Sequence, residues 1–323
     1  MAAVVPMFYR VVMNPDFIHV ATNGDDSTGL GTSNAPFATI QKGIDTAFDR
    51  DTVFVHSGTY TGDGNRDLNM SGKNIDIISQ SGPLNTIIDC GNTNRAITFA
   101  GGETNMLISG FSIRNGARFL GTGVGGVIQA DNFSTPVFQN CIIVSNNTHH
   151  HTEGGEIAKV AEGHIAHFAI SRAIFYNCVF AHNTVEGTSY SASGPTYPSV
   201  VYGADLFNCT LANNTVGAYG ISTGRVCQVG TVLDGIVWAN SAHELFYDIS
   251  ATYCDLQSAW IGDGNISVDP LFVSPATADF SLQAGSPCIN TGTNMSWMID
   301  SKDIIGNDRI TGGIVDLGAY EHQ

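Results

Sequence analysis

Histidines gather in one central segment of the chain, residues 148–172, which reads THHHTEGGEIAKVAEGHIAHFAISR. An imidazole can transfer a proton near neutral pH or bind a metal ion. A lysine or arginine beside it can stabilise the charge that develops when a base removes a proton next to a carboxylate. We therefore expect the catalytic groups, if the protein has any, at Lys159, His164 and Arg172.

The alternative for this segment is a solvated loop. His149, His150 and His151 are consecutive, and successive side chains of a strand point to opposite faces. These three imidazoles therefore cannot all lie on one strand face. Polar stretches of this kind are also typical of surface connections.

Tyrosines mark a second segment, GTSYSASGPTYPSVVYG, at residues 187–203. A tyrosine ring can stack on a sugar with little loss of side-chain entropy. We expect Tyr190, Tyr197 and Tyr202 to contact a ligand, together with His167 of the first segment. An ordinary surface loop rich in serine, glycine and proline is the alternative.

Acidic residues give a weaker signal. Asp131, Asp205, Asp234 and Asp255 are interpreted as solvent-facing or turn residues rather than as catalytic ones. Ca²⁺ is the one metal we consider, at Asp25 and Asp26 of NGDDSTGLG, although two carboxylates alone also fit a polar turn. We identify no other cofactor, and the seven cysteines form no CxxC zinc pattern.

Composition restricts the class of protein. The chain has 323 residues, 37 glycines, 43% hydrophobic and only 13% charged residues, which excludes a disordered chain. Its net charge of −16 opposes binding to nucleic acid or an anionic membrane. There is no apolar run of membrane-spanning length, and the first residues show no signal-peptide pattern.

A repeated sequence motif predicts how the two segments described above are positioned. FQNCIIVSNNT, FYNCVFAHNT and LFNCTLANNT begin at Phe138, Phe175 and Leu206. When Cys141, Cys178 and Cys209 are aligned with Gly110 and Gly235, an asparagine follows each aligned site five residues later. These asparagines are Asn115, Asn146, Asn183, Asn214 and Asn240. The apolar residue three positions before each site is Leu107, Phe138, Phe175, Leu206 or Val232.

Variable spacing with a fixed local pattern is typical of a solenoid, whose coils stack while its loops vary in length. The repeated motif is short and rich in β-branched and aromatic residues, so it predicts strands. Asparagine suits a sharp bend, because it tolerates a left-handed backbone and its amide can pair with neighbouring coils. We expect the five asparagines to stack at one corner, and Cys141, Cys178 and Cys209 to stack inside as free thiols.

The N-terminal part predicts a helix followed by a strand. Ile40, Ile44 and Phe48 form an apolar stripe at helical spacing behind Pro36, and DTVFVHSGTY then alternates as a strand does. We expect a helix within residues 36–50 that closes the first coil, with those three side chains facing it. An open coil end would expose strand edges.

On these residues the chain resembles the right-handed parallel β-helix proteins of the pectate-lyase-like superfamily. Its last segments, GNISVDPLFV, DFSLQAGSPCINTG and DIIGNDRITGGIVDLGAYE, are similar to the end of secreted bacterial proteins of the choice-of-anchor Q type. The resemblance implies an all-β, single-stranded, right-handed parallel β-helix with an N-terminal capping helix and an irregular C-terminal cap. The expected divisions are an arm at 1–16, cap and first coil at 17–60, β-helix at 61–265 and C-terminal cap at 266–323.

The resemblance implies binding to an extracellular polysaccharide or surface glycan. The phrases of pectin hydrolases, Asn-Thr-Asp, Asp-Asp and Gly-His-Gly, are missing from the central repeats, so whether the protein is an enzyme stays open between a polysaccharide lyase, a glycoside hydrolase and no catalysis. Two alternatives remain: a non-catalytic adhesin or structural protein of the cell surface, and a phage virion protein such as a tailspike. A homo-oligomer is compatible with each, and a trimer with the last.

Overall fold

The computed structural model describes residues 17–120, 123–150, 161–168, 170–189, 197–220 and 223–323. Within these ranges the chain consists of strands and loops, with one α-helix and two short 3-10 helices. The helices are α1 (Ile40–Thr46), η1 (Pro275–Thr277) and η2 (Ser296–Met298). None of the described helices has the length and apolar character needed to cross a membrane.

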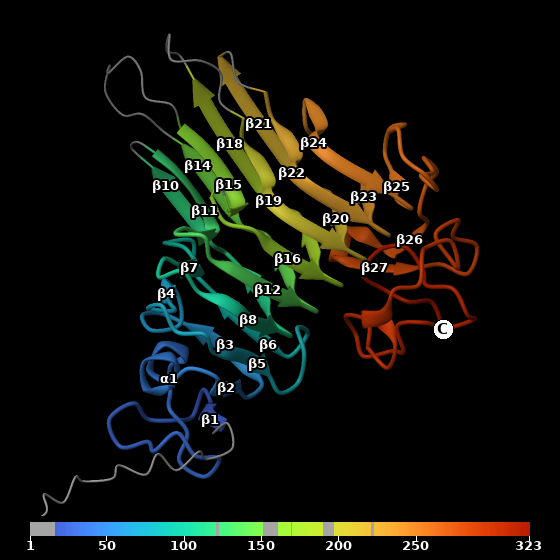
Figure 1. Cartoon of the computed structure of the whole chain (residues 1–323). Helices are drawn as coiled ribbons and strands as arrows, with labels where there is room; N and C mark the ends of the chain where they lie inside the picture. The colour runs from blue at the N-terminus through green and yellow to red at the C-terminus, as the bar shows by residue number, and fades with distance from the viewer. Residues whose placement is uncertain (1–16, 121–122, 151–160, 169, 190–196, 221–222) are drawn as a thin grey trace, which may run out of the picture.

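The described strands form one large sheet, one smaller sheet and one hairpin (Figure 1). The large sheet contains β1 (Phe17–Val20), β2 (Thr52–Val55), β4 (Leu68–Asn69), β5 (Asp76–Ser79), β7 (Ile97–Phe99), β8 (Thr104–Ser109), β10 (Ala117–Leu120), β11 (Gly123–Ala130), β12 (Thr135–Gln139), β14 (Asn147–His150), β15 (Ala161–His167), β16 (Ala173–Tyr176), β18 (Thr184–Ser189), β19 (Ser199–Phe207), β21 (Thr215–Gly220), β22 (Arg225–Leu233) and β24 (Glu244–Thr252). The smaller sheet contains β3 (Gly58–Thr61), β6 (Thr86–Asp89), β9 (Ser112–Arg114), β13 (Ile142–Val144), β17 (Val179–Ala181), β20 (Thr210–Ala212), β23 (Ile236–Trp238) and β25 (Asp255–Leu256). The hairpin is β26 (Phe272–Ser274) with β27 (Asp279–Leu282).

Equivalent strands of successive coils pair in parallel along the chain. In the smaller sheet β13 pairs with β17, β17 with β20, and β20 with β23. In the large sheet β12 pairs with β16, β16 with β19, and β19 with β22. The coils therefore stack into a right-handed parallel β-helix, the hand that parallel crossover connections adopt, and the predicted fold is confirmed.

The core of the solenoid is built from one side chain per coil stacked on the next. The register places a buried apolar residue at each of seven successive positions: Ile77, Ile108, Phe138, Phe175, Leu206, Val232 and Ala251. The rings of Phe138 and Phe175 stack with their centroids 4.7 Å apart. Leu107 was expected in this row, but Ile108 takes the place.

A row of asparagine amides joins the coils at the turn after β13, β17, β20 and β23. The Nδ2 atom of Asn146 donates to Oδ1 of Asn183, which donates likewise to Asn214, and Asn214 to Asn240, at 2.9–3.0 Å. Each Oδ1 also accepts the backbone N–H of the preceding coil's asparagine. All four side chains are buried, and the row satisfies turn groups that would otherwise be costly to bury.

The prediction for Asn115 was wrong by one residue. The strand pairing sets Ile142 opposite Ser112, so that Cys141 is level with Phe111 rather than Gly110. Gly116 consequently takes the position of an asparagine, and its N–H donates to Oδ1 of Asn146. The side chain of Asn115 instead donates to Asp89 on the outside. The thiols of Cys141, Cys178 and Cys209 are free and buried.

Helix α1 packs over the first coil, and its last predicted contact was wrong. The Thr39 side chain caps the helix by accepting the N–H of Lys42, and Ile40 and Ile44 are fully buried. The helix stops at Thr46 because Ala47 adopts an extended backbone. Phe48 therefore leaves the apolar stripe, and 78% of it is exposed.

The C-terminal segment covers one side of the solenoid (Figure 1). Apolar residues of β26, β27 and the following loops pack on the outer face of the smaller sheet; the contact includes Ile142, Val179, Ala181, Ala212, Ile236, Phe272, Phe280, Leu282, Ile304 and Leu317. Because both faces of the sheet are thus buried, β17 and β20 show no alternation of buried and exposed residues. Trp297 packs on the ring of Tyr176 beyond this face.

Candidate functional site

Six strands of the large sheet share a four-residue arrangement. Two consecutive buried apolar residues form its centre, and one further residue flanks them on each side. The apolar pairs lie in the core. The position before the pair is Arg95, Gly126, His164, Ser199, Arg225 or Glu244, which we call the first row. The position after it is Thr98, Gln129, His167, Tyr202, Gln228 or Tyr247, the second row.

Both rows flank the same bend in the strands, where His164 and Arg225 are buried and Tyr247 is exposed. Two consecutive inward residues would not fit a straight strand, in which neighbours alternate, so the strand bends there and the flanking side chains converge. The rings of His164 and His167 stack 4.7 Å apart, and Nη1 of Arg225 donates to Oε1 of Gln228 at 3.2 Å. We call the two together the paired rows.

Histidines and a tyrosine meet in the middle of the paired rows. The Tyr202 ring lies 5.4 Å from the rings of both His164 and His167. Nδ1 of His164 shares a hydrogen bond of 2.9 Å with the Ser199 hydroxyl on the next coil. Burial lowers the pKa of His167 to about 3, and the neighbouring His164 and Arg95 act in the same direction. The His167 imidazole is therefore neutral at neutral pH.

An arginine sandwich continues the paired rows toward the C-terminal coils. The guanidinium carbon of Arg225 lies 4.1 Å from the ring centre of Tyr197 and 4.2 Å from that of Tyr247, and the two rings are parallel within 1°. Nε of Arg225 donates to Oε2 of Glu244 at 2.7 Å. Arg225 is 6% exposed, whereas Tyr247 is 54% exposed, so the cation stiffens a ring whose other face meets solvent.

The structure brings together four of the residues predicted from sequence. His164, His167 and Tyr202 contact one another, and Tyr197 belongs to the arginine sandwich. Lys159 and Tyr190 lie outside the described residues. Arg172 forms a bidentate ion pair with Asp205 rather than contacting the histidines.

The calcium hypothesis stays untested. Asp25 accepts the N–H groups of Ser27 and Thr28, and Asp26 accepts those of Ala38 and Thr39. These bonds already give both carboxylates a role in shaping the loop. In the described ranges, no three His, Cys, Asp or Glu side chains are grouped so that they could hold a metal ion.

Sequence reasoning missed Arg225, Gln228 and Tyr247. The available signal was the pattern itself: HIAH, SVVY, RVCQ and ELFY each place two apolar residues between outward ones, at His164, Ser199, Arg225 and Glu244. Outward residues differ in type from coil to coil, so no repeated letter draws attention to them. Only the strand register shows that they stack.

Comparison with known proteins adds little to this geometry. No family model matches the chain, and no curated protein sequence does, so the choice-of-anchor Q resemblance finds no support there. Among solved structures the chain is similar to a rhamnogalacturonan lyase, with 15% identity, a TM-score of 0.38 and coverage of 73% of this chain and 74% of that one. It is also similar to pectate lyase Pel9A, with 16% identity, a TM-score of 0.34 and coverage of 95% of this chain and 96% of that one. Pectin methylesterase PemA from Erwinia chrysanthemi has 11% identity, a TM-score of 0.34 and coverage of 82% of this chain and 98% of that one. At these values the likeness carries no argument about activity.

Proposed function

We propose that the protein binds a polysaccharide along the paired rows, outside the cell. One observation carries the proposal: the six positions of the second row, from Thr98 to Tyr247, all hold polar or aromatic side chains stacked in register. Five steps at the inter-strand spacing of about 4.8 Å give a length of about 24 Å. A surface of that length suits an extended polymer better than a compact small molecule.

The chemistry of the rows fits sugar units. The half-exposed ring of Tyr247 offers an apolar face for stacking. Tyr202 and Gln129, which are partly exposed, bring a hydroxyl and an amide group to the same strip, which suits hydroxyl-rich ligands. Arg225 is held rigid by two rings and Glu244, so that ordering it on binding requires little additional entropy.

The test is a screen of polysaccharides for binding to the wild-type protein and to Tyr247→Ala. We expect binding of one glycan class and a loss of affinity of about tenfold or more in the variant, because stacking and its buried area are removed. Tyr253→Ala is the matched control: Tyr253 is 37% exposed in the same region but lies outside the rows. Equal binding by all three proteins would refute the assignment of this face.

A second candidate function is cleavage of the bound chain by β-elimination. It is favoured by the stacking of the His167 and His164 imidazoles, 4.7 Å apart, with Arg95 near enough to affect the pKa of His167. A base would remove the proton beside the uronate carboxylate, a cation would hold the enolate charge, and loss of the glycosidic oxygen would leave a double bond. In the described part of the rows the one carboxylate, Glu244, is paired with Arg225, so two-carboxylate hydrolysis is less favoured.

Ultraviolet absorbance of unsaturated uronate products, read in the same screen, separates these functions. Turnover that is lost in His167→Gln while binding persists supports a lyase. Binding without any product supports an adhesin, a structural protein or a virion protein instead. The oligomeric state in solution then distinguishes a tailspike-like trimer from the other two.

A further inference from the structure

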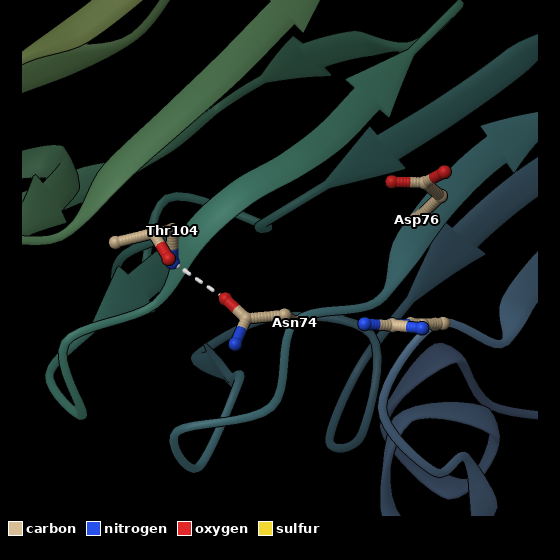
Figure 2. Close-up of a pocket in the computed structure, with 4 residues that line it drawn as sticks. Asn74, Asp76 and Thr104 are labelled. Atoms are coloured by element: carbon tan, nitrogen blue, oxygen red, sulfur yellow. Dashed lines mark hydrogen bonds between the residues drawn. The ribbon is translucent and has the colours of Figure 1, made fainter.

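A polar hollow of about 420 Å³ lies away from the paired rows, where β2, β5 and β8 begin. Arg50, Asn74, Asp76 and Thr104 line it, and we call it the Arg50 pocket. Figure 2 shows Asp76 across the hollow from Asn74 and Thr104, and the Oδ1 atom of Asn74 accepting the Thr104 N–H at 2.6 Å. The volume is within the range of small-molecule sites.

The Arg50 pocket has a positional counterpart later in the solenoid. Asp76 pairs in register with Thr52, and Arg50 stands two residues before Thr52. Asp205 pairs in register with Ile174, and Arg172 stands two residues before Ile174. Arginine and aspartate therefore occupy equivalent places in the two regions.

The two regions use these places differently. Arg172 and Asp205 close on each other in a bidentate ion pair. Among the described residues the guanidinium of Arg50 has no ion pair or hydrogen bond. Arg50 holds a left-handed backbone, with φ at 77°, and Oδ1 of Asp76 is engaged by the N–H of Leu107 at 2.9 Å. The arginine and the aspartate thus stay apart across a hollow.

We propose that the Arg50 pocket binds an acidic sugar unit. A guanidinium offers a fork of donors that matches a carboxylate, and Arg50 is the cation of the pocket. The second oxygen of Asp76 can accept from a sugar hydroxyl, while the amide nitrogen of Asn74 and the Thr104 hydroxyl offer further polar contacts. A ligand with a carboxylate on one side and hydroxyls on the other spans the gap that the counterpart pair closes directly.

The backbone of Arg50 is left-handed, as it is at many other turns of this solenoid. A left-handed conformation is disfavoured for a residue with a Cβ atom, and glycine or asparagine would adopt it more easily. The chain keeps it here through the N–H of Arg50, which donates to the carbonyl of Asn74 at 2.8 Å. This proposal does not depend on the paired rows, because the two sites share no residue.

The experiment measures binding of glucuronate, glucose and inorganic phosphate to the full chain by titration calorimetry or ligand-observed NMR. The variants are Arg50→Asn, which suits the left-handed backbone and removes the charge, and Asp76→Asn, which keeps an acceptor for Leu107. The matched control is Arg172→Asn, which removes the same charge from the counterpart pair. Circular dichroism checks that each variant folds.

We expect glucuronate to bind the wild type and Arg172→Asn equally, and Arg50→Asn about tenfold or more weakly, since one charge-assisted contact is lost. Glucose should bind weakly because it lacks the carboxylate. Phosphate that binds as well as glucuronate would reduce the pocket to a simple anion site and overturn the sugar assignment. The pocket assignment would be overturned if glucuronate did not bind, or if Tyr247→Ala abolished binding and Arg50→Asn did not. Neither result would decide the function of the paired rows, which have their own test.

Discussion

In the part of the chain that the structure describes, two arginines are almost fully buried, and their surroundings differ. Arg309 is 0% exposed and donates through Nη2 to the carbonyls of Asp316 and Gly318, both at 2.8 Å. Glu321, its nearest carboxylate at 4.0 Å, is buried as well. Arg225 is enclosed by Tyr197, Tyr247 and Glu244, of which the last two reach solvent.

The difference is the one expected between a structural arginine and an arginine of the proposed binding surface. The carboxylates around Arg309 fix the backbone of the C-terminal segment: Glu321 accepts the N–H groups of Thr311 and Asp316, and Asp303 accepts that of Glu321. Every partner there is used inside the protein. Around Arg225 one ring face and one carboxylate stay accessible, which is what a binding surface needs.

The largest effect should follow from changing Arg309 to Met, which keeps the volume but removes the charge. We expect the free energy of unfolding to fall by about 3–5 kcal/mol, because Glu321 and the carbonyls of Asp316 and Gly318 lose their buried partner. Arg225→Met should lower it by no more than about 1–2 kcal/mol, since Glu244 can turn to water. Urea denaturation measures both, and equal losses would remove the distinction between the two regions.

Asn183 is a buried polar residue that carries no charge, in contrast to Arg309. Its Nδ2 donates to Asn214 and to the carbonyl of Ile143, both at 2.9 Å, and its side chain is fully buried. Asn183→Ala should lower the free energy of unfolding by about 1–3 kcal/mol through unpaired turn groups. Asn115→Gly is the control, because glycine accepts the positive φ at that position and Asn115 stands outside the row. It loses only the hydrogen bond to Asp89, so a smaller loss of about 1 kcal/mol or less is expected.

The two regions should respond to pH with opposite signs. Burial raises the pKa of Asp234 and of Glu321, each to about 7, beside Arg309. The folded state holds these protons while the unfolded state releases them at lower pH, so their contribution to stability increases as the pH falls from about 8 to 5. Burial lowers the pKa of His167 to about 3, so stability in the paired rows is lost as the pH falls below about 6.5.

Each such group changes the free energy of unfolding by up to about 1.4 kcal/mol per pH unit in its window. Hydrogen exchange between pH 5 and 8 should therefore show protection increasing toward acid in the C-terminal segment and decreasing in β15. Asp234→Asn should flatten the first trend and His167→Gln the second. The same trend in both regions would contradict the assigned protonation states.

The smallest effect is expected at Phe48, which is exposed although it was expected to pack on the first coil. Phe48→Ala should change the free energy of unfolding by no more than about 0.5 kcal/mol. Ile44→Ala, one helical turn earlier and fully buried, should lower it by about 2–5 kcal/mol. A pair of thermal unfolding curves suffices, and a large loss in the Phe48 variant would mean that the helix continues beyond Thr46.

Sequence patterns predicted the features that every coil must repeat. A tight turn accepts few residue types, so Asn146, Asn183, Asn214 and Asn240 recur and reveal the solenoid. The slip at Asn115 arose because Gly110, a small residue, matches the cysteine position in sequence, whereas strand pairing puts Phe111 at that position and Gly116 at the asparagine position. The helix was predictable from its stripe, but its end depends on the backbone of Ala47.

The binding face and the C-terminal cover were harder to predict for a physical reason. The residues that flank the apolar pairs do not repeat from coil to coil: His164, Ser199 and Arg225 stack in register and are buried, but each makes different contacts. The sequence does indicate that this sheet is covered, because β17 and β20 are buried at every position without alternation, as in a sheet buried on both faces. Which segment buries the outer face is a long-range question that local patterns do not answer.

Hydroxyl-radical footprinting with and without the polysaccharide identified in the screen tests the central claim most directly. We expect bound glycan to protect Tyr247 and Tyr202 from oxidation, while Tyr253, which is also partly exposed, reacts at the same rate in both samples. Protection of Tyr253 with unchanged oxidation of Tyr247 and Tyr202 would place the glycan elsewhere and contradict the assignment of the paired rows.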